Sequence, residues 1–435
     1  MSAPWRDGRE RSFDVAVLGA GIAGMCAAAR ASQAGARVIV LDPAPSIGGS
    51  AALSHGNVWT VADTSLLASE DPGSYCRHAS MVVDEFAAVT TWLAGFGGVT
   101  RERTSSRFRQ VQQIDVSLTL LRMAQTVFAR GGVVELESRV ADLERTPPGL
   151  RLALTTPAGA SAVHVDAVVV ATGGRQADPQ VRSALNSGAP ALLRGNRHSD
   201  GSGIALAQSL GASVNFANRG FYGHLMPVGV APLSGLDYLA LTLYHSAHGV
   251  LLDRTGKRFT HERNGDARNA MALADRGGIG LLLWSEKVQR AAALDPAPVE
   301  LALDRWRYAA DRGAHVSRAA TAAEALLTAR AWGFDGLSEH GEEDLRGLGT
   351  GPTYIAHVVP GITFTYGGLR ADDGGRVLDA ENRSIAGLFT AGADLSDIYH
   401  RGYCGGLSAA AVTGRRAGAG AAAHAHSLKG KPSCP

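Results

Sequence analysis

The apolar and polar positions of residues 13–42 predict a strand, a helix and a second strand in succession. The run DVAVL at 14–18 is short, continuous and apolar, as in a buried strand. The segment MCAAARASQAGA at 25–36 has a helical composition, and RVIVLD at 37–42 is a second apolar run. Two buried strands joined by a helix predict a βαβ unit, and therefore an α/β fold with a parallel sheet.

Two apolar runs farther along the chain also end at glycines. VDAVVVATGG occupies residues 165–174, and GLFTAG occupies residues 387–392 with Asp394 just beyond it. Each run is short, apolar and bounded by turn-forming residues, which is typical of a buried strand. We expect both to return to the sheet that the first strand begins.

The turn between the first strand and the helix carries Gly19, Gly21 and Gly24. Glycines at this spacing allow a tight turn, close approach of a pyrophosphate and close helix–strand packing. The N-terminus of the helix adds N–H groups and a favourable dipole for phosphates. Asp42 ends the second strand, where a carboxylate accepts a hydrogen bond from a ribose hydroxyl. This pattern predicts a dinucleotide site, although a βαβ turn without a ligand remains the alternative.

Two further segments favour FAD over NAD at this site. Gly48–Gly49 and the small residues up to Gly56 form a loop along which a long ligand can lie, although a merely flexible glycine loop would have the same composition. The late strand that ends at Gly392 and Asp394 suits the second half of an extended cofactor. NAD needs no such return, whereas the two-part FAD does.

Composition excludes several other classes of protein. Of the 435 residues, 45% are hydrophobic and 19% are charged, and the net charge of +2 gives no reason to expect nucleic acid or membrane partners. No apolar run approaches the roughly 18 residues of a membrane span. The polar start MSAPWRDGRERSF is unlike a signal peptide, and the four cysteines form no C-x-x-C pair. We therefore expect a reduced, cytoplasmic protein without a metal site.

The order of several segments resembles one flavoprotein family, which includes fumarate reductase flavoproteins and 3-ketosteroid dehydrogenases. The segments are GAGIAG, GGSAALSHGNVW, ATGG, SDGSGIALAQSLGA, LLDRTGKRF, TYGGLRADDGGRVLD, IAGLFTAGAD and YCGGLSAAAVTGRRAG. The last is also similar to tricarballylate dehydrogenases. The resemblance covers residues 13 to about 425 and implies a doubly wound, Rossmann-like FAD-binding domain interrupted by an α+β capping domain. We expect a tail at 1–12, the FAD domain at 13–214 and 363–427, the cap at 215–362, and a tail at 428–435.

The resemblance also implies which residues contact FAD. They come from the glycine turn, the loop after the second strand, the later strand ends and the last helix: Gly19, Gly21, Ala23, Gly24, Asp42, Gly49, Ser50, Ala51, His55, Gly56, Val140, Thr172, Gly173, Asp200, Gly392, Asp394 and Ser408. Some relatives attach FAD through a histidine. Ser50 stands at the matching position here and His55 is out of register, so we expect non-covalent FAD.

The segment DGSGIALAQSLGA is not expected to be a second nucleotide fingerprint. The polar stretch RGNRHS precedes it, in place of the buried strand that a fingerprint requires. Electrons are therefore expected to come from, or go to, an unidentified partner other than bound NAD(P)H.

Tyr403 is the first candidate for the acid–base chemistry. It precedes Gly405–Gly406 at a predicted helix start, and the resemblance places a ketosteroid dehydrogenase tyrosine there. A phenol can act as a base or donate to a carbonyl, provided that its pKa suits the task. The alternative is a packed aromatic residue at a helix N-terminus. Arg401 and His400 flank it and either contact an anionic group or lie in solvent.

The other candidates lie in the expected cap or, in the case of Phe364, directly after it. His224 matches a substrate-binding histidine of fumarate reductases, and Tyr222 and Tyr244 are expected near it. Asp266 stands where those enzymes carry a catalytic arginine, so the standard proton donor is not assured. Phe364 stands where they place a histidine for a dicarboxylate, which favours a larger, more apolar substrate.

These residues predict an FAD-dependent oxidoreductase that acts on a C–C bond next to a carbonyl, of a fairly apolar, ketosteroid-like substrate. The catalytic candidates are Tyr403, Asp266 and Tyr244, and the substrate-binding candidates are Tyr222, His224, Phe364 and Arg401. One alternative is a reductase or dehydrogenase of small carboxylates. A flavin-binding electron-transfer subunit is the other, although a cap of this size is not needed by an electron carrier.

Overall fold

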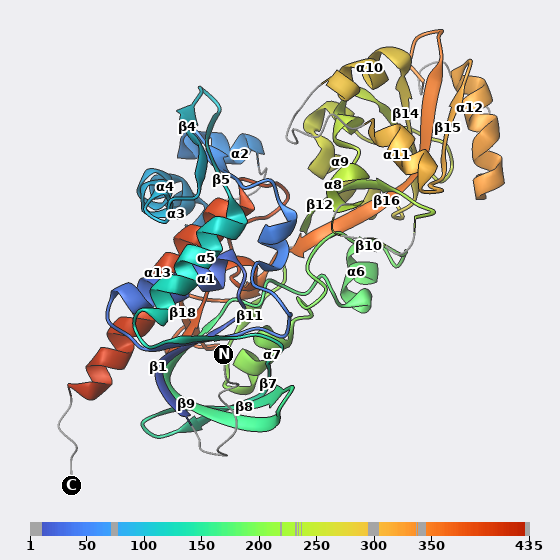
Figure 1. Cartoon of the computed structure of the whole chain (residues 1–435). Helices are drawn as coiled ribbons and strands as arrows, with labels where there is room; N and C mark the ends of the chain where they lie inside the picture. Colours follow the sequence, from blue (N-terminus) through green and yellow to red (C-terminus); the bar gives the residue numbers. More distant parts are fainter. Residues whose placement is uncertain are drawn as a thin grey trace. The chain divides into compact units, whose positions relative to one another are not determined.

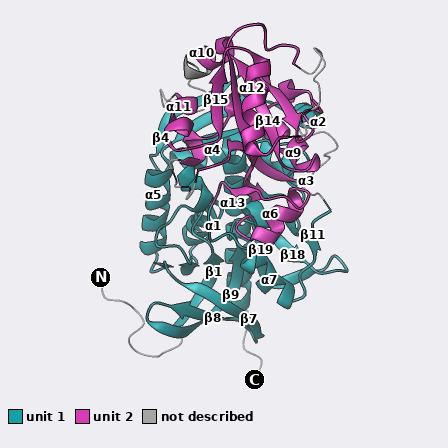
Figure 2. Ribbon diagram, turned by 90° about the vertical axis from the view of Figure 1, so that its right-hand side faces the viewer, with its two compact units in different colours: residues 1–175, 196–219, 365–435 teal, residues 176–195, 220–364 magenta. Residues whose placement is uncertain are grey.

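A computed structural model describes residues 11–70, 77–217, 220–230, 233, 235, 237–294, 304–335, 337 and 345–430. The chain divides into two compact units (Figure 2). Unit 1 comprises residues 1–175, 196–219 and 365–435, and unit 2 comprises residues 176–195 and 220–364. Residues 1–10 of the expected N-terminal tail lie outside the described residues, and the first strand begins at Arg11.

Unit 1 contains the elements expected of the cofactor domain. Its helices are α1 (Ile22–Gln33), α2 (Leu67–Glu70), α3 (Arg77–Asp84), α4 (Phe86–Ala94), α5 (Val116–Phe128), α7 (Ser202–Ser209) and α13 (Gly406–Lys429). Its strands are β1 (Arg11–Leu18), β2 (Val38–Leu41), β3 (Asn57–Val61), β4 (Val99–Ser105), β5 (Arg109–Ile114), β6 (Val133–Glu135), β7 (Arg139–Thr146), β8 (Gly149–Thr156), β9 (Gly159–Val170), β11 (Val214–Asn215), β17 (Gly368–Leu369), β18 (Arg376–Leu378) and β19 (Ser384–Thr390).

The main sheet of unit 1 confirms the α/β fold that the apolar runs predict. Its strand order is β18-β19-β9-β1-β2-β6; the five strands from β19 to β6 pair in parallel, and β18 pairs antiparallel with β19. Every residue of β2 is buried, as a strand covered on both faces requires. The runs at 165–174 and 387–392 therefore do return to the sheet that β1 begins, and the carboxyl ends of β1, β9 and β19 lie at one edge.

Helices α1, α5 and α13 pack together beside this sheet (Figure 1). Gly414 and Gly418 of α13 face α1 so closely that a Cβ at either position would lie 2.2 Å from a backbone oxygen, that of Ala23 or Ala27. The glycines therefore set the separation of the two helices. Their contact fixes the N-terminus of α1, where the glycine turn lies.

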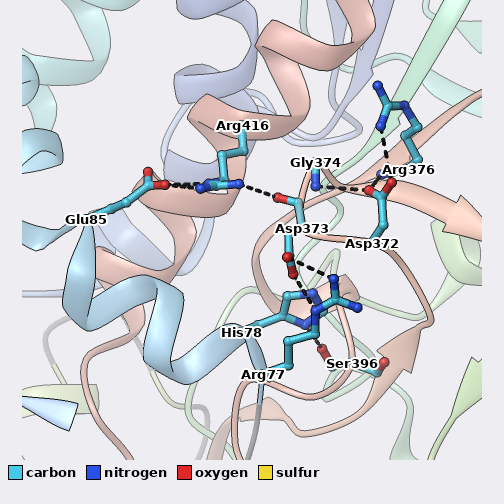
Figure 3. A network of polar contacts seen from close by, with 9 residues as sticks. All are labelled: Arg77, His78, Glu85, Asp372, Asp373, Gly374, Arg376, Ser396 and Arg416. Atoms are coloured by element: carbon cyan, nitrogen blue, oxygen red, sulfur yellow. Dashed lines mark hydrogen bonds and ion pairs between the residues drawn. The ribbon is translucent and has the colours of Figure 1, made fainter.

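A polar network joins α3, α13 and the turn before β18 (Figure 3). Asp373 is its centre: its carboxylate forms an ion pair with Arg77 at 2.6 Å, and its carbonyl oxygen accepts from Arg416 Nη1 at 2.9 Å. Arg416 also forms an ion pair with Glu85, just before α4. Because Arg77 and Asp373 are largely exposed, the network contributes modestly to stability, and its main effect is to order these segments.

Unit 2 is a mixed sheet with helices. Its helices are α6 (Pro179–Leu185), α8 (Asp237–Ala240), α9 (Asp266–Asp275), α10 (Glu286–Leu294), α11 (Arg305–Asp311) and α12 (Ala322–Ala329). Its strands are β10 (Leu192–Leu193), β12 (Phe221–Pro227), β13 (Val250–Asp253), β14 (Gly280–Ser285), β15 (Val316–Ala319) and β16 (Thr353–Thr365), the last residue of which belongs to unit 1. The long strand β16 is central, because β10, β12, β14 and β15 all pair with it.

Among the described residues, no helix is both long and apolar enough to span a membrane, and no cluster of three metal-ligating side chains is found. Cys26 and Cys404 are buried and are not joined in a disulfide bond. Cys76 and Cys434 lie outside the described residues.

Candidate functional site

The three glycines of the first turn have different roles in the structure. A Cβ on Gly19 would lie 2.2 Å from the Ala171 oxygen, and one on Gly24 would lie 1.9 Å from the Gly19 oxygen, so the protein itself requires glycine at both positions. Gly21 is different, because its nearest contact would be the Gly48 oxygen at 3.9 Å. Gly21 is also the N-cap of α1 and has no side chain to cover the first N–H groups of that helix. A helix N-terminus without a side-chain cap fits a pyrophosphate. A bound pyrophosphate would therefore explain why position 21 is glycine, which contacts within the protein do not explain.

Asp42 lies directly after β2 and is 5% exposed. One carboxylate oxygen accepts from Ala20 N–H at 2.6 Å, and the other accepts from Ala44 N–H at 2.8 Å. Burial raises the pKa of this carboxyl group, against the two N–H bonds and the charge of His198. The carboxylate thus fixes the turn before α1 to the end of β2. Each of its two oxygens accepts one N–H and keeps a lone pair that can accept from a further donor.

A cavity in unit 1 lies beside this carboxylate. It is lined by the ends of β1 and β2, the start of β7 and the start of α7: Leu18, Gly19, Leu41, Asp42, Pro43, Ser138, Arg139, Val140, Thr172, Asn196, His198, Ser202, Gly203 and Leu206. The mixture of apolar walls and one buried carboxylate fits a nucleoside. Asp200, expected near the flavin, pairs with Arg139 at 2.9 Å and accepts from Ser202 N–H at 3.0 Å at the start of α7.

The loop after β2 lies against the same turn. Gly48 forms a bridge with Gly21, and its N–H donates to the Ala20 oxygen at 2.9 Å. Ser50 Oγ accepts from Asn196 N–H at 3.1 Å, and Ala51 is buried. A Cβ on Gly56 would lie 1.9 Å from the Ile114 oxygen, so the backbone requires this glycine. His55 is half-buried in the same loop, and its expected non-covalent relation to FAD stays a prediction.

Asp394 joins the ends of β9 and β19. It is fully buried, and its carboxylate accepts from Thr172 N–H and hydroxyl, Gly173 N–H and Gly174 N–H. Burial raises the pKa of Asp394 in spite of these bonds. The structure therefore gives this residue a role in fixing the ATGG turn, and its direct contact with FAD stays a prediction.

Tyr403 lies in an aromatic cluster at the N-terminus of α13. Its ring is 5.5 Å from that of Trp59 and 5.8 Å from that of Tyr399, and Gly406 N–H donates to its hydroxyl at 2.7 Å. Ser408 Oγ donates to the Trp59 oxygen at 2.6 Å, and a Cβ on Gly405 would lie 1.8 Å from that oxygen. The phenol is thus held in one orientation. Sequence reasoning missed Trp59 and Tyr399, which carry no motif of their own.

Unit 2 brings together His224, Asp266 and Tyr222. His224 lies on β12 with 3% of its side chain exposed, and Asp266 is the first residue of α9. The Nδ1 atom of His224 lies 2.5 Å from a carboxylate oxygen of Asp266, and its Nε2 atom lies 3.0 Å from the Tyr222 hydroxyl. Sequence reasoning proposed all three residues, but it did not predict that they form one chain of hydrogen bonds.

Titration of this pair is set by burial and by neighbouring charge. Burial and the charge of Arg194 lower the pKa of His224, and they outweigh the opposite effect of Asp266. Burial raises the pKa of Asp266, but the contacts with His224, the Ala267 N–H and the charge of Arg194 hold it below its usual range. Near neutral pH, a neutral imidazole therefore faces an ionised carboxylate.

Arg194 is the residue of this cluster that sequence reasoning missed. It is 6% exposed, and its guanidinium donates to the Tyr238 oxygen, Thr242 Oγ1, Thr363 Oγ1 and the Tyr244 hydroxyl at 2.8–3.0 Å. The pairing of β10 with β16 places it there, and no local signal marks so distant a contact.

Aromatic rings complete the cluster. The His224 ring lies 4.9 Å from that of Tyr222 and 5.0 Å from that of Tyr244, and Tyr222 lies 5.5 Å from Phe364. Four of the residues predicted for substrate chemistry in the cap, together with Asp266, thus belong to one cluster of unit 2. Arg401 is exposed in the loop before α13 in unit 1, and its role stays a prediction.

Comparison with known proteins gives a consistent result. A family model described as "FAD binding domain" matches residues 14–88 and 75–408. The chain is 23% identical over 457 residues to a fumarate reductase (cytochrome) of Shewanella frigidimarina, covering 94% of this chain and 77% of that protein. It is 27% identical over 269 residues to a 3-oxosteroid 1-dehydrogenase of Mycobacterium tuberculosis, covering 52% of this chain and 46% of that one.

Among solved structures, the chain is similar to 3-ketosteroid-delta4-(5alpha)-dehydrogenase from Rhodococcus jostii RHA1. The TM-score is 0.68 at 21% identity, and the match covers 97% of this chain and 99% of that one. Likeness at this identity shows the fold.

Proposed function

Because this chain belongs to the family defined by that FAD binding domain, and is an FAD-dependent oxidoreductase acting on CH–CH groups, we propose that its substrate is a fairly apolar molecule with a carbonyl next to the reacting C–C bond. Bound FAD accepts or supplies the hydride at N5. The residues of the chain must then bind the substrate, polarise its carbonyl and move one proton.

The observation that carries this proposal is the charge pattern of the His224 cluster. Asp266 places a carboxylate 2.5 Å from His224, and a carboxylate repels an anionic substrate. Arg194 is the buried cation of the cluster, and its guanidinium already donates to Thr363 and Tyr244 as well as to two groups near α8. A dicarboxylate needs cationic donors that can turn to it, so this arrangement is poorly suited to fumarate-like substrates.

The rings of Tyr222, Tyr244 and Phe364 support the same choice. They offer apolar surface with two phenolic hydroxyls, which suits a neutral carbonyl compound. Tyr403 is proposed as a further phenol of the reaction, either as the donor to the carbonyl or as the proton acceptor. The resemblance of the YCGGLSAA segment to ketosteroid dehydrogenases supports this role.

Anaerobic reduction of the purified, FAD-loaded enzyme tests the proposal. 4-Androstene-3,17-dione, smaller cyclic ketones and succinate are mixed in turn with the oxidised enzyme, and loss of flavin absorbance is followed. For the reductive direction, the photoreduced enzyme is mixed with a conjugated enone or with fumarate, and the return of absorbance is followed. We expect a ketone or an enone to react at least tenfold faster than succinate or fumarate. A faster reaction with the carboxylates would establish the alternative instead, and no reaction with any of the probes would reject this substrate class.

A further inference from the structure

The hydrogen-bond directions within the His224 cluster follow from its electrostatics. Asp266 is ionised near neutral pH and can only accept, so His224 Nδ1 must carry the proton of the 2.5 Å contact. His224 is neutral, so its Nε2 atom has a lone pair and accepts from the Tyr222 hydroxyl at 3.0 Å. Each bond therefore runs in one direction, from Tyr222 through His224 to Asp266.

From this geometry we infer that Tyr222 is the acid–base residue of the reaction, with His224 and Asp266 as the positioning residues that take up and stabilise its proton. The inference rests on the proposed function and deepens it. In dehydrogenation, the Tyr222 oxygen takes the proton from the substrate carbon as its own proton passes to His224 Nε2. FAD, when bound, would take the hydride, so that one proton and one hydride leave the substrate. In reduction, the same proton returns by the reverse path.

Burial supports this division of roles. His224 is 3% exposed, so a substrate has little access to the imidazole, whereas Tyr222 is half-buried. The imidazolium that forms when His224 takes the proton lies against the Asp266 carboxylate, whose charge offsets part of the cost of a buried cation. A carboxylate that orients an imidazole and stabilises its cation is a known way to draw the proton from a hydroxyl group and make its oxygen more reactive.

The other charged and titratable groups near His224 act in a defined direction. Arg194 lowers the pKa of His224. The Tyr244 ring lies edge-on to the His224 ring at 5.0 Å, and the Tyr244 hydroxyl accepts from Arg194 at 3.0 Å. Arg305 lies over the Tyr244 ring at 5.4 Å. Burial and the charge of Arg194 keep the resting imidazole neutral, and Asp266 is the group that favours its protonated form. Loss of the carboxylate should therefore lower the pKa of His224 further and make the imidazole a weaker acceptor of the Tyr222 proton.

The first experiment needs no substrate. Holoenzyme labelled with nitrogen-15 in histidine is studied by NMR, with His224 assigned through His224→Gln. We expect a protonated Nδ1, a hydrogen-bonded and unprotonated Nε2 near neutral pH, and a titration midpoint below that of an exposed histidine. Tyr222→Phe should shift only the Nε2 resonance, and Asp266→Asn should abolish the preference for the Nδ1-protonated tautomer. A bare Nδ1 in the wild type, or a Nε2 resonance unchanged in Tyr222→Phe, would overturn the relay.

The second experiment measures turnover on the probe that bleaches the flavin. We expect Tyr222→Phe to lower kcat by roughly 10²–10⁴ with little change in KM. Asp266→Asn should lower kcat at least tenfold, because the imidazolium that forms would lose the neighbouring carboxylate charge. Tyr308→Phe is the matched control, because it removes a phenol–carboxylate bond to Asp237 at 2.8 Å elsewhere in unit 2, and should keep the wild-type rate.

The outcomes separate the two proposals. A Tyr222→Phe rate within a few-fold of wild type would refute the acid–base role, even if the NMR data confirm the hydrogen bonds. If none of the probes reacts with the flavin, the proposed substrate class fails, and the NMR arm still decides whether the relay exists.

Discussion

Replacement of Asp42 by alanine tests how one buried carboxylate serves both the fold and the cofactor. The substitution removes the acceptor of two N–H groups, those of Ala20 and Ala44, at 2.6 and 2.8 Å. Stranding a buried donor costs about 1–3 kcal/mol, so the apoprotein should lose roughly 2–4 kcal/mol of unfolding free energy. A lost ribose contact should weaken FAD binding by a further 1–3 kcal/mol, or roughly 10–100-fold in Kd.

Asp14→Ala is the matched control for this experiment. Asp14 lies in β1 and also accepts a backbone N–H, that of Arg37 at 2.9 Å, but this bond lies at the surface, and the ion pair of Asp14 is with the largely exposed Lys429. It should lose less than about 1 kcal/mol and bind FAD normally. Urea unfolding of the apoproteins measures the first effect, and quenching of FAD fluorescence measures the second. An Asp42→Ala apoprotein as stable as Asp14→Ala would refute the structural part, and an unchanged Kd would place the ribose elsewhere.

Three further predictions concern the glycine turn, the α13 phenol and acid stability. Gly21→Ala should weaken FAD binding at least tenfold and leave the unfolding free energy of the apoprotein unchanged. Gly24→Ala should destabilise the apoprotein as well, because its Cβ would lie 1.9 Å from a backbone oxygen. Equal stabilities of the two apoproteins would contradict this distinction. Tyr403→Phe should keep FAD content and thermal midpoint but lower turnover by roughly 10²–10⁴, and survival of the rate would leave Tyr403 as a packed aromatic residue. Burial, followed by nearby positive charge, lowers the pKa of His245 and of His357 to about 4. The unfolded chain therefore binds more protons than the folded one below about pH 6.5, and stability should fall as pH drops towards 4, with His245 accounting for on the order of 1–2 kcal/mol at about pH 5. Urea midpoints of wild type and His245→Asn at several pH values measure this, and identical pH slopes would show that His245 is not involved.

Much of unit 1 could be predicted because its signals are local. The buried strands are continuous apolar runs, and the turn glycines are required within a few residues of where they stand, as Gly24 against the Gly19 oxygen shows. The role of Asp394 was harder to predict. Its position after a strand indicated a ligand contact, but the bonds that occupy it come from the ATGG turn more than 200 residues earlier, with sequence separations of 220–222.

The cluster of unit 2 was only partly predictable for the same reason. His224, Tyr222 and Asp266 could be proposed one by one from the resemblance, but the contact between His224 and Asp266 depends on how α9 packs against β12. Arg194 reaches Thr363 across 169 residues, through strand pairing that leaves no trace in the local sequence. A single sequence gives residue types at a site more readily than the directions of the bonds among them.

Those directions distinguish two phenols that look alike in the sequence. The Tyr403 hydroxyl accepts an N–H from Gly406 at 2.7 Å, at the N-terminus of a helix of 24 residues. Accepting this bond draws electron density from the oxygen and makes the O–H a better donor, and the helix dipole acts in the same direction. The Tyr222 hydroxyl instead donates to a neutral imidazole at 3.0 Å, which makes its oxygen a better proton acceptor. Of the two roles proposed for Tyr403, donation to a carbonyl is therefore the better matched, whereas the hydrogen bond of Tyr222 suits the proton acceptor that we propose it to be.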